Sequence, residues 1–460
     1  MAKKSHGAIR GLFVICSIKM KLTFAGGASE VTGANYILET GDTRIMVDCG
    51  LHQGTAARER GNWDPFSYDV TKINALFVTH SHIDHIGRIP LLLKRGFKGT
   101  IYSTPPCRDA AHELLLDSEH LLFGVADRAG VEPLYGPEDV EHAMNIWEGI
   151  EYHTPVIVGD ITATLYNAGH VLGSSSVLVQ GKDGKRIIFS GDLGNSPAPL
   201  LGGKDMMPDA DFCLIESAYG NRIHEDRAKR KELLEDAIED TVKNGGTLMI
   251  PTFALERTQE LLSELDDLVE SGRIPAVPVY MDSPLAIRLT EIYKKYPDYL
   301  KAGSFDFHFK GLHITSTTEQ SKAINAAPAP KIVIAGSGMS NGGRILHHEK
   351  NYLPDPKSMF LAIGYQAEGT LGRRILDGDK SVTIFSEKVP VHCKVRAIGG
   401  YSAHADQRQL LDWLSSGRDT LERVFVVQGE GEASAALAVK IKDELAIQAE
   451  VPEAGKTYEL

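Results

Sequence analysis

The sequence has few cysteines and no long hydrophobic run. Its five cysteines are odd in number, widely spaced and without a C-x-x-C pair, so neither a disulfide framework nor a thiolate zinc site is indicated. This cysteine usage favours a reducing, cytoplasmic location. The longest early apolar run, Leu12 to Ile18, is far shorter than the about 20 residues that a membrane-spanning helix needs. We therefore expect no membrane association.

A strong charge bias is also lacking, because 49 basic and 61 acidic side chains leave a net charge of only −12 in 460 residues. An acidic balance normally argues against a nucleic-acid substrate, but a divalent metal and a local basic groove can reverse the field at one site. With 42% apolar and 24% charged residues, the chain is typical of a globular protein with a sizeable core. Its length predicts roughly two or three domains.

The order of the predicted strands and helices differs between two parts of the chain. From Met20 onward, short alternating strands with Gly-containing turns form two meanders, over residues 21–49 and 161–192. After about Tyr219, strand and helix alternate, which is typical of a parallel α/β sheet. We expect a disordered extension at 1–19, a β-rich domain from 20–219 and 395–460, and an α/β insert over 220–394.

One dense motif dominates the chemistry. The predicted strand NALFVTH runs into HSHIDH, which contributes His80, His82, Asp84 and His85. A turn after a strand projects His80 and His82 in one direction and carries Asp84 and His85 to a neighbouring position, so two metals could be held a few ångström apart. Imidazole and carboxylate without thiolate suit zinc, with manganese or iron as alternatives.

A metal site needs further ligands, and two residues that end other predicted strands can supply them. His170 ends ITATLYNAGH and Asp192 ends KRIIFSGD. Alone, each would be read as a turn or cap residue, but together with HSHIDH they favour metal ligation. Asp48, at the end of TRIMVDC, is either a turn residue or a carboxylate that orients a ligand histidine through a hydrogen bond.

With these motifs, the sequence from Met20 to Leu460 resembles the metallo-β-lactamase superfamily and, more narrowly, its β-CASP branch of nucleic-acid hydrolases. The stretches ESAYG, YSAHAD and GYQAEGTLGRR resemble that branch specifically. The likeness is closest to RNA-cleaving members related to the endonuclease subunit of the cleavage and polyadenylation machinery. The resemblance implies an α/β fold, a metallo-β-lactamase αββα sandwich with an inserted β-CASP domain that has a parallel sheet.

The resemblance also implies site residues and a cofactor. Two zinc ions would activate a hydroxide, one held by His80, His82 and His170 and the other by Asp84, His85 and a bridging Asp192. Glu216 matches the acidic residue of motif A, and His404 matches the histidine of motif B. We assign His404, oriented by Glu216, to protonate the departing O3′. Asp84, Asp192, Glu216 and His404 are therefore the expected catalytic residues.

One position departs from the family pattern. RNA-directed members carry a motif C histidine in V-H-G-E, whereas VFVVQGEGE places Gln428 there. A neutral amide oxygen is a weaker zinc ligand than imidazole, so the second zinc site is expected to be weakened. The same position differs between RNA-cleaving and DNA-cleaving members, so the substitution bears on the substrate as well.

We expect the glycine-rich loops of the insert to bind the substrate. Glycines let backbone N–H groups approach an anion, and an arginine at a helix start adds positive charge, although such loops are commonly only tight turns. The residues we expect to contact phosphate are Ser337, Gly338, Gly342, Gly343, Arg344, Gly369 and Arg373.

The expected function is hydrolysis of RNA, most favourably single-stranded, by an endoribonuclease, with 5′-to-3′ exonuclease activity as a second option. The alternative is a β-CASP RNA-binding module with weak or no turnover, because of Gln428. A small-substrate hydrolase of this superfamily would lack the insert, which argues against that third class. The sequence leaves the oligomeric state open, with a homodimer among the options.

Overall fold

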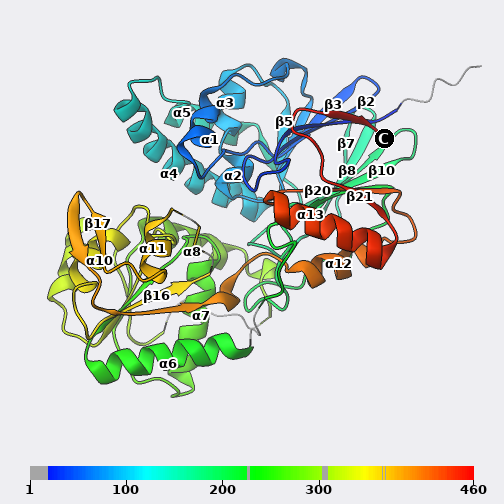
Figure 1. Ribbon diagram of the computed structural model, residues 1–460. Helices are drawn as coiled ribbons and strands as arrows, with labels where there is room; N and C mark the ends of the chain where they lie inside the picture. The colour runs from blue at the N-terminus through cyan, green and yellow to red at the C-terminus, as the bar shows by residue number, and fades with distance from the viewer. Residues whose placement is uncertain (1–18, 225–227, 303–308, 365, 368) are drawn as a thin grey trace, which may run out of the picture.

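The computed structural model describes residues 19–224, 228–302, 309–364, 366–367 and 369–460, which form two lobes (Figure 1). Of the expected N-terminal extension, only Lys19 lies within the described residues. Two seven-stranded sheets belong to one lobe and a six-stranded sheet belongs to the other. The helices of the described residues include none that is long and apolar enough to cross a membrane.

The first sheet combines the N-terminal meander with parallel strands, in the order β22-β1-β2-β3-β4-β5-β6. Its outer face is covered by helices through a cluster that contains Leu92 and Leu115. The strands are β1 (Lys21–Gly26), β2 (Asn35–Thr40), β3 (Thr43–Val47), β4 (Ala75–Phe77), β5 (Thr100–Ser103), β6 (Trp147–Gly149) and β22 (Thr457–Glu459). The helices on this side are α1 (Ala56–Arg60), α2 (Ile83–Ile86), α3 (Ile89–Lys94), α4 (Pro105–Ala129) and α5 (Pro137–Asn145).

The second sheet has the order β21-β20-β11-β10-β9-β8-β7 and faces the first. Phe24, Phe189 and Phe425 pack between the two sheets. Helices α12 (Gln407–Ser415) and α13 (Gly431–Lys440) cover the outer face. The result is the expected four-layer αββα sandwich. The strands are β7 (Val156–Val158), β8 (Ile161–Asn167), β9 (Ser175–Gly181), β10 (Arg186–Phe189), β11 (Phe212–Glu216), β20 (Arg423–Val427) and β21 (Gln448–Glu450).

The insert is an α/β lobe whose sheet has the order β14-β13-β15-β12-β16-β19, and its neighbouring strands are parallel. Its strands are β12 (Thr247–Pro251), β13 (Val279–Met281), β14 (Leu312–Ile314), β15 (Lys331–Ala335), β16 (Met359–Ile363) and β19 (Lys394–Ile398). Helices α6 (Ala228–Asn244) and α7 (Arg257–Glu270) cover one face, and α10 (Ile345–Tyr352) and α11 (Leu371–Leu376) cover the other. A hairpin of β17 (Ser381–Ile384) and β18 (Glu387–Pro390) precedes β19.

The return from the insert differs from the expected boundary at Val395. Val395 pairs with Phe360 of β16, so β19 is the edge strand of the insert's sheet rather than the first strand of the returning domain. The sequence KVRAI alternates too weakly between apolar and polar residues to show which sheet it joins. The chain therefore returns to the sandwich beyond Ile398.

The two lobes meet along α4 and α8 (Pro284–Lys295). Arg288 of α8 forms an ion pair with Glu113 of α4 at 2.5 Å. Beneath it, Leu172 and Leu200 of the sandwich share an apolar cluster with Leu289 of the insert. Burial of these side chains on both sides fixes the lobes against each other.

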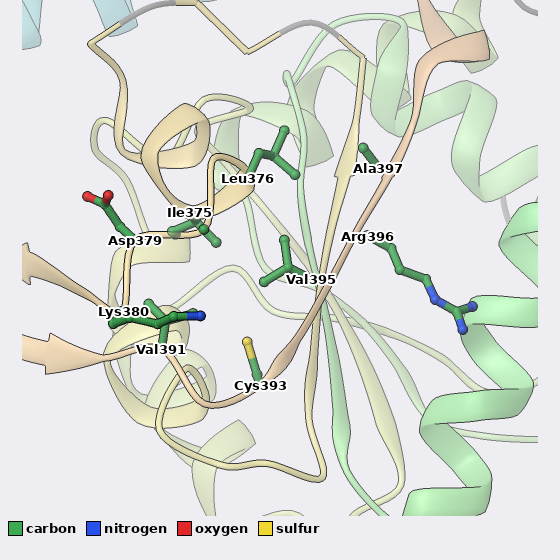
Figure 2. A pocket seen from close by; sticks show the side chains of 10 residues that line it. Ile375, Leu376, Asp379, Lys380, Val391, Cys393, Val395, Arg396 and Ala397 are labelled. Carbon is green, nitrogen blue, oxygen red and sulfur yellow. The ribbon is translucent and has the colours of Figure 1, made fainter.

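The insert also has a hollow of about 460 Å³ between α11 and β19 (Figure 2). Leu376, Val391 and Val395 line it, together with the Cys393 thiol and the charged Lys380 and Arg396. Among the described residues that line this hollow, there is none of the site residues predicted from the sequence. The side chains expected to bind metal gather instead within the sandwich.

Candidate metal centre

Four side chains of metal-ligating type meet where strands of the two facing sheets end. His80 and His82 follow β4, His170 follows β8, and Asp192 follows β10. One ligand atom from each lies within 4.8 Å of the others. Nδ1 of His82 lies 3.0 Å from Nε2 of His80 and 3.2 Å from Nε2 of His170. His170 and Asp192 lie more than 80 residues beyond HSHIDH in the sequence. The fold brings both of them next to His80 and His82.

Glycine permits the loops that carry His170 and Asp192 to touch. The Gly194 amide donates to the Ala168 carbonyl at 2.8 Å. A Cβ atom at position 194 would lie 1.8 Å from the Gly169 carbonyl oxygen, so a larger residue would push the loops apart. This close approach sets the spacing between His170 and Asp192.

The second half of the motif lies beside the first. Nε2 of His85 is 3.5 Å from Oδ1 of Asp192 and 3.9 Å from Oδ2 of Asp84. The side-chain amide of Gln428 reaches the same point, with Nε2 2.8 Å from Nε2 of His85 and 3.2 Å from Oδ1 of Asp192. Asp192 therefore faces both halves. Since an amide can present either its oxygen or its nitrogen after a half-turn, Gln428 can offer at most one neutral oxygen here.

Asp48 lies behind the histidines, in contact with His85. Its Oδ2 atom is 2.8 Å from Nδ1 of His85 and accepts a hydrogen bond from the Thr79 hydroxyl at 2.8 Å. The Thr79 hydroxyl also lies 3.1 Å from Nδ1 of His80. Sequence reasoning singled out Asp48 but missed Thr79, because a threonine just after a strand carries no signal of such a contact.

Glu216 and His404 form a third group next to Asp192. Nδ1 of His404 is 3.2 Å from Oε2 of Glu216 and 3.8 Å from Oδ2 of Asp192. The Leu193 amide donates to Glu216 at 2.7 Å. Residues around His404 pair with the loop after Asp192, since the Ala405 amide donates to the Leu193 carbonyl at 2.7 Å. The return from the insert thus places His404 next to the loop that follows Asp192.

The donor set fits zinc at the first group. Burial lowers the pKa of His82 and of His170 well below the usual range, so both imidazoles are neutral and have lone pairs to donate. Burial would raise the pKa of Asp192, but His85 and His80 outweigh it and hold the pKa well below the usual range. Three imidazole side chains and one ionised carboxylate are donors that suit zinc.

The residues expected to contact phosphate lie at the carboxyl ends of strands in the insert, but their contacts differ. Arg344 donates to Asp282 at 2.7 Å and to the Thr315 carbonyl at 3.0 Å, so its guanidinium is engaged within the insert. The Ser337 hydroxyl accepts from the Asn341 amide at 3.0 Å. These contacts favour a structural role for Arg344. The other expected residues are Gly338, Gly342, Gly343, Gly369 and Arg373, and the last forms an ion pair with Asp377 at 2.9 Å.

Three known families match consecutive parts of the chain. The metallo-beta-lactamase superfamily matches residues 29–237, the Beta-Casp domain matches residues 258–375, and the Zn-dependent metallo-hydrolase RNA specificity domain matches residues 388–452. The order agrees with a sandwich interrupted by an insert.

Curated relatives extend over nearly the whole chain. Ribonuclease TTHA0252 of Thermus thermophilus is 39% identical over 91% of this chain and 95% of its own length. An RNase J-like protein of Methanocaldococcus jannaschii is 32% identical over 94% of this chain and 98% of its own. Transcription termination factor FttA of Methanosarcina mazei is 31% identical over 93% of this chain and 70% of its own.

A solved structure has the same overall arrangement. The crystal structure of a protein of unknown function from Enterococcus faecalis V583 aligns with a TM-score of 0.56 and 13% identity, covering 96% of this chain and 100% of that one. At 13% identity, this similarity supports the fold alone. Membership of a family is shown by the family matches and by the relatives that align over most of their length. The chain therefore belongs to the metallo-β-lactamase superfamily and, within it, to the β-CASP ribonuclease family.

Proposed function

We propose that this protein hydrolyses phosphodiester bonds of RNA, with zinc held by His80, His82, His170 and Asp192. The observation that carries the proposal is the position of Asp192, which belongs both to this cluster and to the group with Glu216 and His404. A metal-ligating cluster and an acid–base pair that share one carboxylate can act on the same bond. The names of the relatives and the match to an RNA specificity domain support RNA as substrate.

Bound zinc would supply Lewis acidity and activate water at neutral pH. The protein's own residues then set the geometry. The buried, neutral imidazoles of His82 and His170 would hold the cation, and ionised Asp192 contributes negative charge to the site. Asp48 and Thr79 hold His85 and His80 so that their Nε2 atoms face the reaction centre.

His404 is the proposed proton donor to the departing O3′. Burial acts to lower the pKa of His404, but the carboxylates of Glu216 and Asp192 outweigh it and raise the pKa to about 9. The imidazole therefore carries a proton at neutral pH. With Nδ1 held by Glu216 and the side chain 27% exposed, Nε2 is the atom that we assign to proton donation. The products would be a 5′-phosphate and a 3′-hydroxyl.

For the second zinc ion, the donor set supports weaker binding. Asp84, His85 and Asp192 would supply two carboxylates and one imidazole to a second ion, and the neighbouring side chain that could complete the set is the neutral amide of Gln428. An amide oxygen binds zinc less strongly than an imidazole nitrogen. We propose that one zinc ion binds tightly and that the second binds more weakly.

The test is incubation of zinc-replete protein with a labelled single-stranded RNA and its DNA counterpart, alongside His82→Ala. We expect cleavage of RNA by the wild type and none by the variant. A 5′-end label on one substrate and a circular RNA as another distinguish internal cleavage, which we propose, from 5′-to-3′ digestion. Equal inactivity of wild type and variant, with RNA still bound, would instead support the binding-module alternative.

A further inference from the structure

His170 differs from its neighbours in how its ring is oriented. His80 and His85 each have Nδ1 within hydrogen-bond distance of a buried oxygen, at 3.1 Å from Thr79 and 2.8 Å from Asp48. Nδ1 of His170 is buried and has no hydrogen-bond partner among the described residues. Metal-bound imidazoles usually have the other ring nitrogen fixed in this way. The orientation of His170 must therefore come largely from the backbone of its loop.

On the sandwich side, that loop is held at both ends. The Ser174 hydroxyl accepts from the His170 amide at 2.9 Å and from the Val171 amide at 3.2 Å. The Thr104 hydroxyl donates to the Gly173 carbonyl at 2.6 Å. Between these fixed points lies Leu172, which faces the insert.

The insert holds Leu172 with two completely buried side chains. The Leu172 backbone lies beside the Glu256 carboxylate, just before α7, and beside the Tyr293 hydroxyl of α8, and its N–H acts to lower the pKa of both groups. Tyr293 also packs in the same apolar cluster as Leu172. The Tyr293 hydroxyl in turn donates to Oε2 of Glu256. Glu256 is 1% exposed and Tyr293 is 0% exposed, and Leu172 packs with Leu289 in the apolar cluster between the lobes. Two elements of the insert thus converge on one peptide group, two residues after a metal ligand.

The backbone at Glu256 is unusual. Its φ angle is +64°, in the left-handed region that a non-glycine residue rarely adopts. Such a conformation costs of order 1–3 kcal/mol and persists where the surroundings enforce it, often at functional sites. The other carboxylate oxygen, Oε1, is buried without a partner among the described residues. Both the positive φ angle and the unpartnered Oε1 atom are unfavourable for folding. Glu256 nevertheless adopts this conformation, in which its carboxylate lies beside Leu172.

We propose that Glu256 and Tyr293 are positioning residues that form an interdomain latch on Leu172, so that docking of the insert sets the orientation of His170 and the zinc affinity of its site. The inference rests on the proposed zinc site. Because coupling between two equilibria is reciprocal, zinc binding should in turn stabilise the docked arrangement of the lobes.

The test measures zinc affinity by competition with a chromogenic chelator, in the full chain, for wild type, Glu256→Gly, Glu256→Gln and Tyr293→Phe. Glycine removes the carboxylate and accepts a φ of +64° without strain, so it separates loss of the latch from backbone damage. We expect about 10-fold weaker zinc binding for Glu256→Gly. Glu256→Gln keeps an oxygen acceptor for the Leu172 amide and should restore most of the affinity.

Glu349 offers a matched control in the same lobe. It is also fully buried, also has one oxygen without a partner among the described residues, and burial raises its pKa to about 8, as it does for Glu256. Its contact is the Ser340 hydroxyl in the insert, at 2.5 Å, and not the His170 loop. Glu349→Gln should leave zinc affinity unchanged.

A second measurement does not depend on metal. Hydrogen exchange of the metal-free protein should show faster exchange of the Leu172 amide in Glu256→Gly than in wild type or Glu349→Gln. Wild-type zinc affinity and wild-type exchange in Glu256→Gly would overturn the latch while leaving the proposed function intact. Absence of zinc binding by the wild type itself would overturn both.

Discussion

Oδ2 of Asp48 lies 2.8 Å from Nδ1 of His85, and Oδ1 of the same carboxylate accepts from the Thr79 amide at 2.8 Å. One buried carboxylate therefore fixes both a candidate metal ligand and the strand end that carries HSHIDH. Asp48 itself has a φ angle of +57°. That conformation, after β3, points its side chain at the histidines.

Replacement of Asp48 should weaken catalysis through the histidine that it holds. Asn tolerates a positive φ, so Asp48→Asn should fold while it loses the charged acceptor for His85. We expect a 10- to 100-fold fall in zinc affinity or cleavage rate, because loss of a partner of a ligand histidine has effects of that size. The fall in cleavage rate is measured with labelled RNA at a fixed concentration of free zinc. Asp160→Asn removes a surface ion pair with Lys182 and should have no effect, and equal rates for both variants would refute this role of Asp48.

Gln428 gives the metal stoichiometry a direct test. Gln428→His would place an imidazole beside His85 and Asp192. We expect bound zinc, measured by elemental analysis after gel filtration, to rise from about one toward two ions per chain, because imidazole binds zinc more strongly than an amide. Cleavage should become faster. An unchanged metal content and rate would mean that position 428 does not contribute to zinc binding.

Loss of the proposed proton donor should separate chemistry from metal binding. His404→Ala and Glu216→Gln should each reduce kcat for RNA cleavage by about 10²- to 10⁴-fold, the usual contribution of a general acid. Zinc content should stay at the wild-type value, because the proposed zinc ligands are His80, His82, His170 and Asp192, and the second group of metal-ligating type, Asp192, Glu216 and His404, shares only Asp192 with them. His153→Ala removes an imidazole that is 59% exposed and paired with Asp205, and it serves as the control. A loss of zinc in His404→Ala would assign this histidine to the metal instead.

The part of the site that sequence could predict is the part with local spacing or strand-end positions. HSHIDH is compact, and His170 and Asp192 each follow a strand whose alternation is clear. The parallel sheet of the insert was predicted from the succession of strand and helix, and the αββα sandwich from the family resemblance. The structure and the family matches confirm both.

Contacts between segments far apart in the chain could not be predicted from the sequence. Nothing in PTFALERTQ indicates that Glu256 meets Leu172 across a domain interface, because that contact depends on how α4 and α8 dock. Arg344 follows a glycine-rich loop and was expected at phosphate, yet Asp282, 62 residues earlier, engages its guanidinium. A buried acidic partner on another strand cannot be read from the loop itself.

Asp282 itself should make the insert sensitive to acid. Burial would raise the pKa of Asp282, but hydrogen bonds from His348, Ser321, Thr315 and Arg344 outweigh it and lower the pKa to about 2. The unfolded chain titrates near 3.9, so the native state favours the ionised form. This contribution to the free energy of unfolding, about 2 kcal/mol, is present above about pH 4 and lost as the pH falls through about 2.

Asp282→Asn should therefore lower the free energy of unfolding by about 2 kcal/mol at pH 7 and by less than about 1 kcal/mol at pH 2.5. Urea unfolding at pH 7, 4 and 2.5, followed by circular dichroism, measures the difference. Asp379→Asn, which breaks an exposed ion pair with Arg374, should change stability by less than about 1 kcal/mol at each pH. A deficit of the same size at pH 7 and pH 2.5 would show that packing at position 282, rather than its charge, stabilises the insert. The expected convergence at low pH would identify the ionised Asp282 as the group that holds Arg344 and His348 in place.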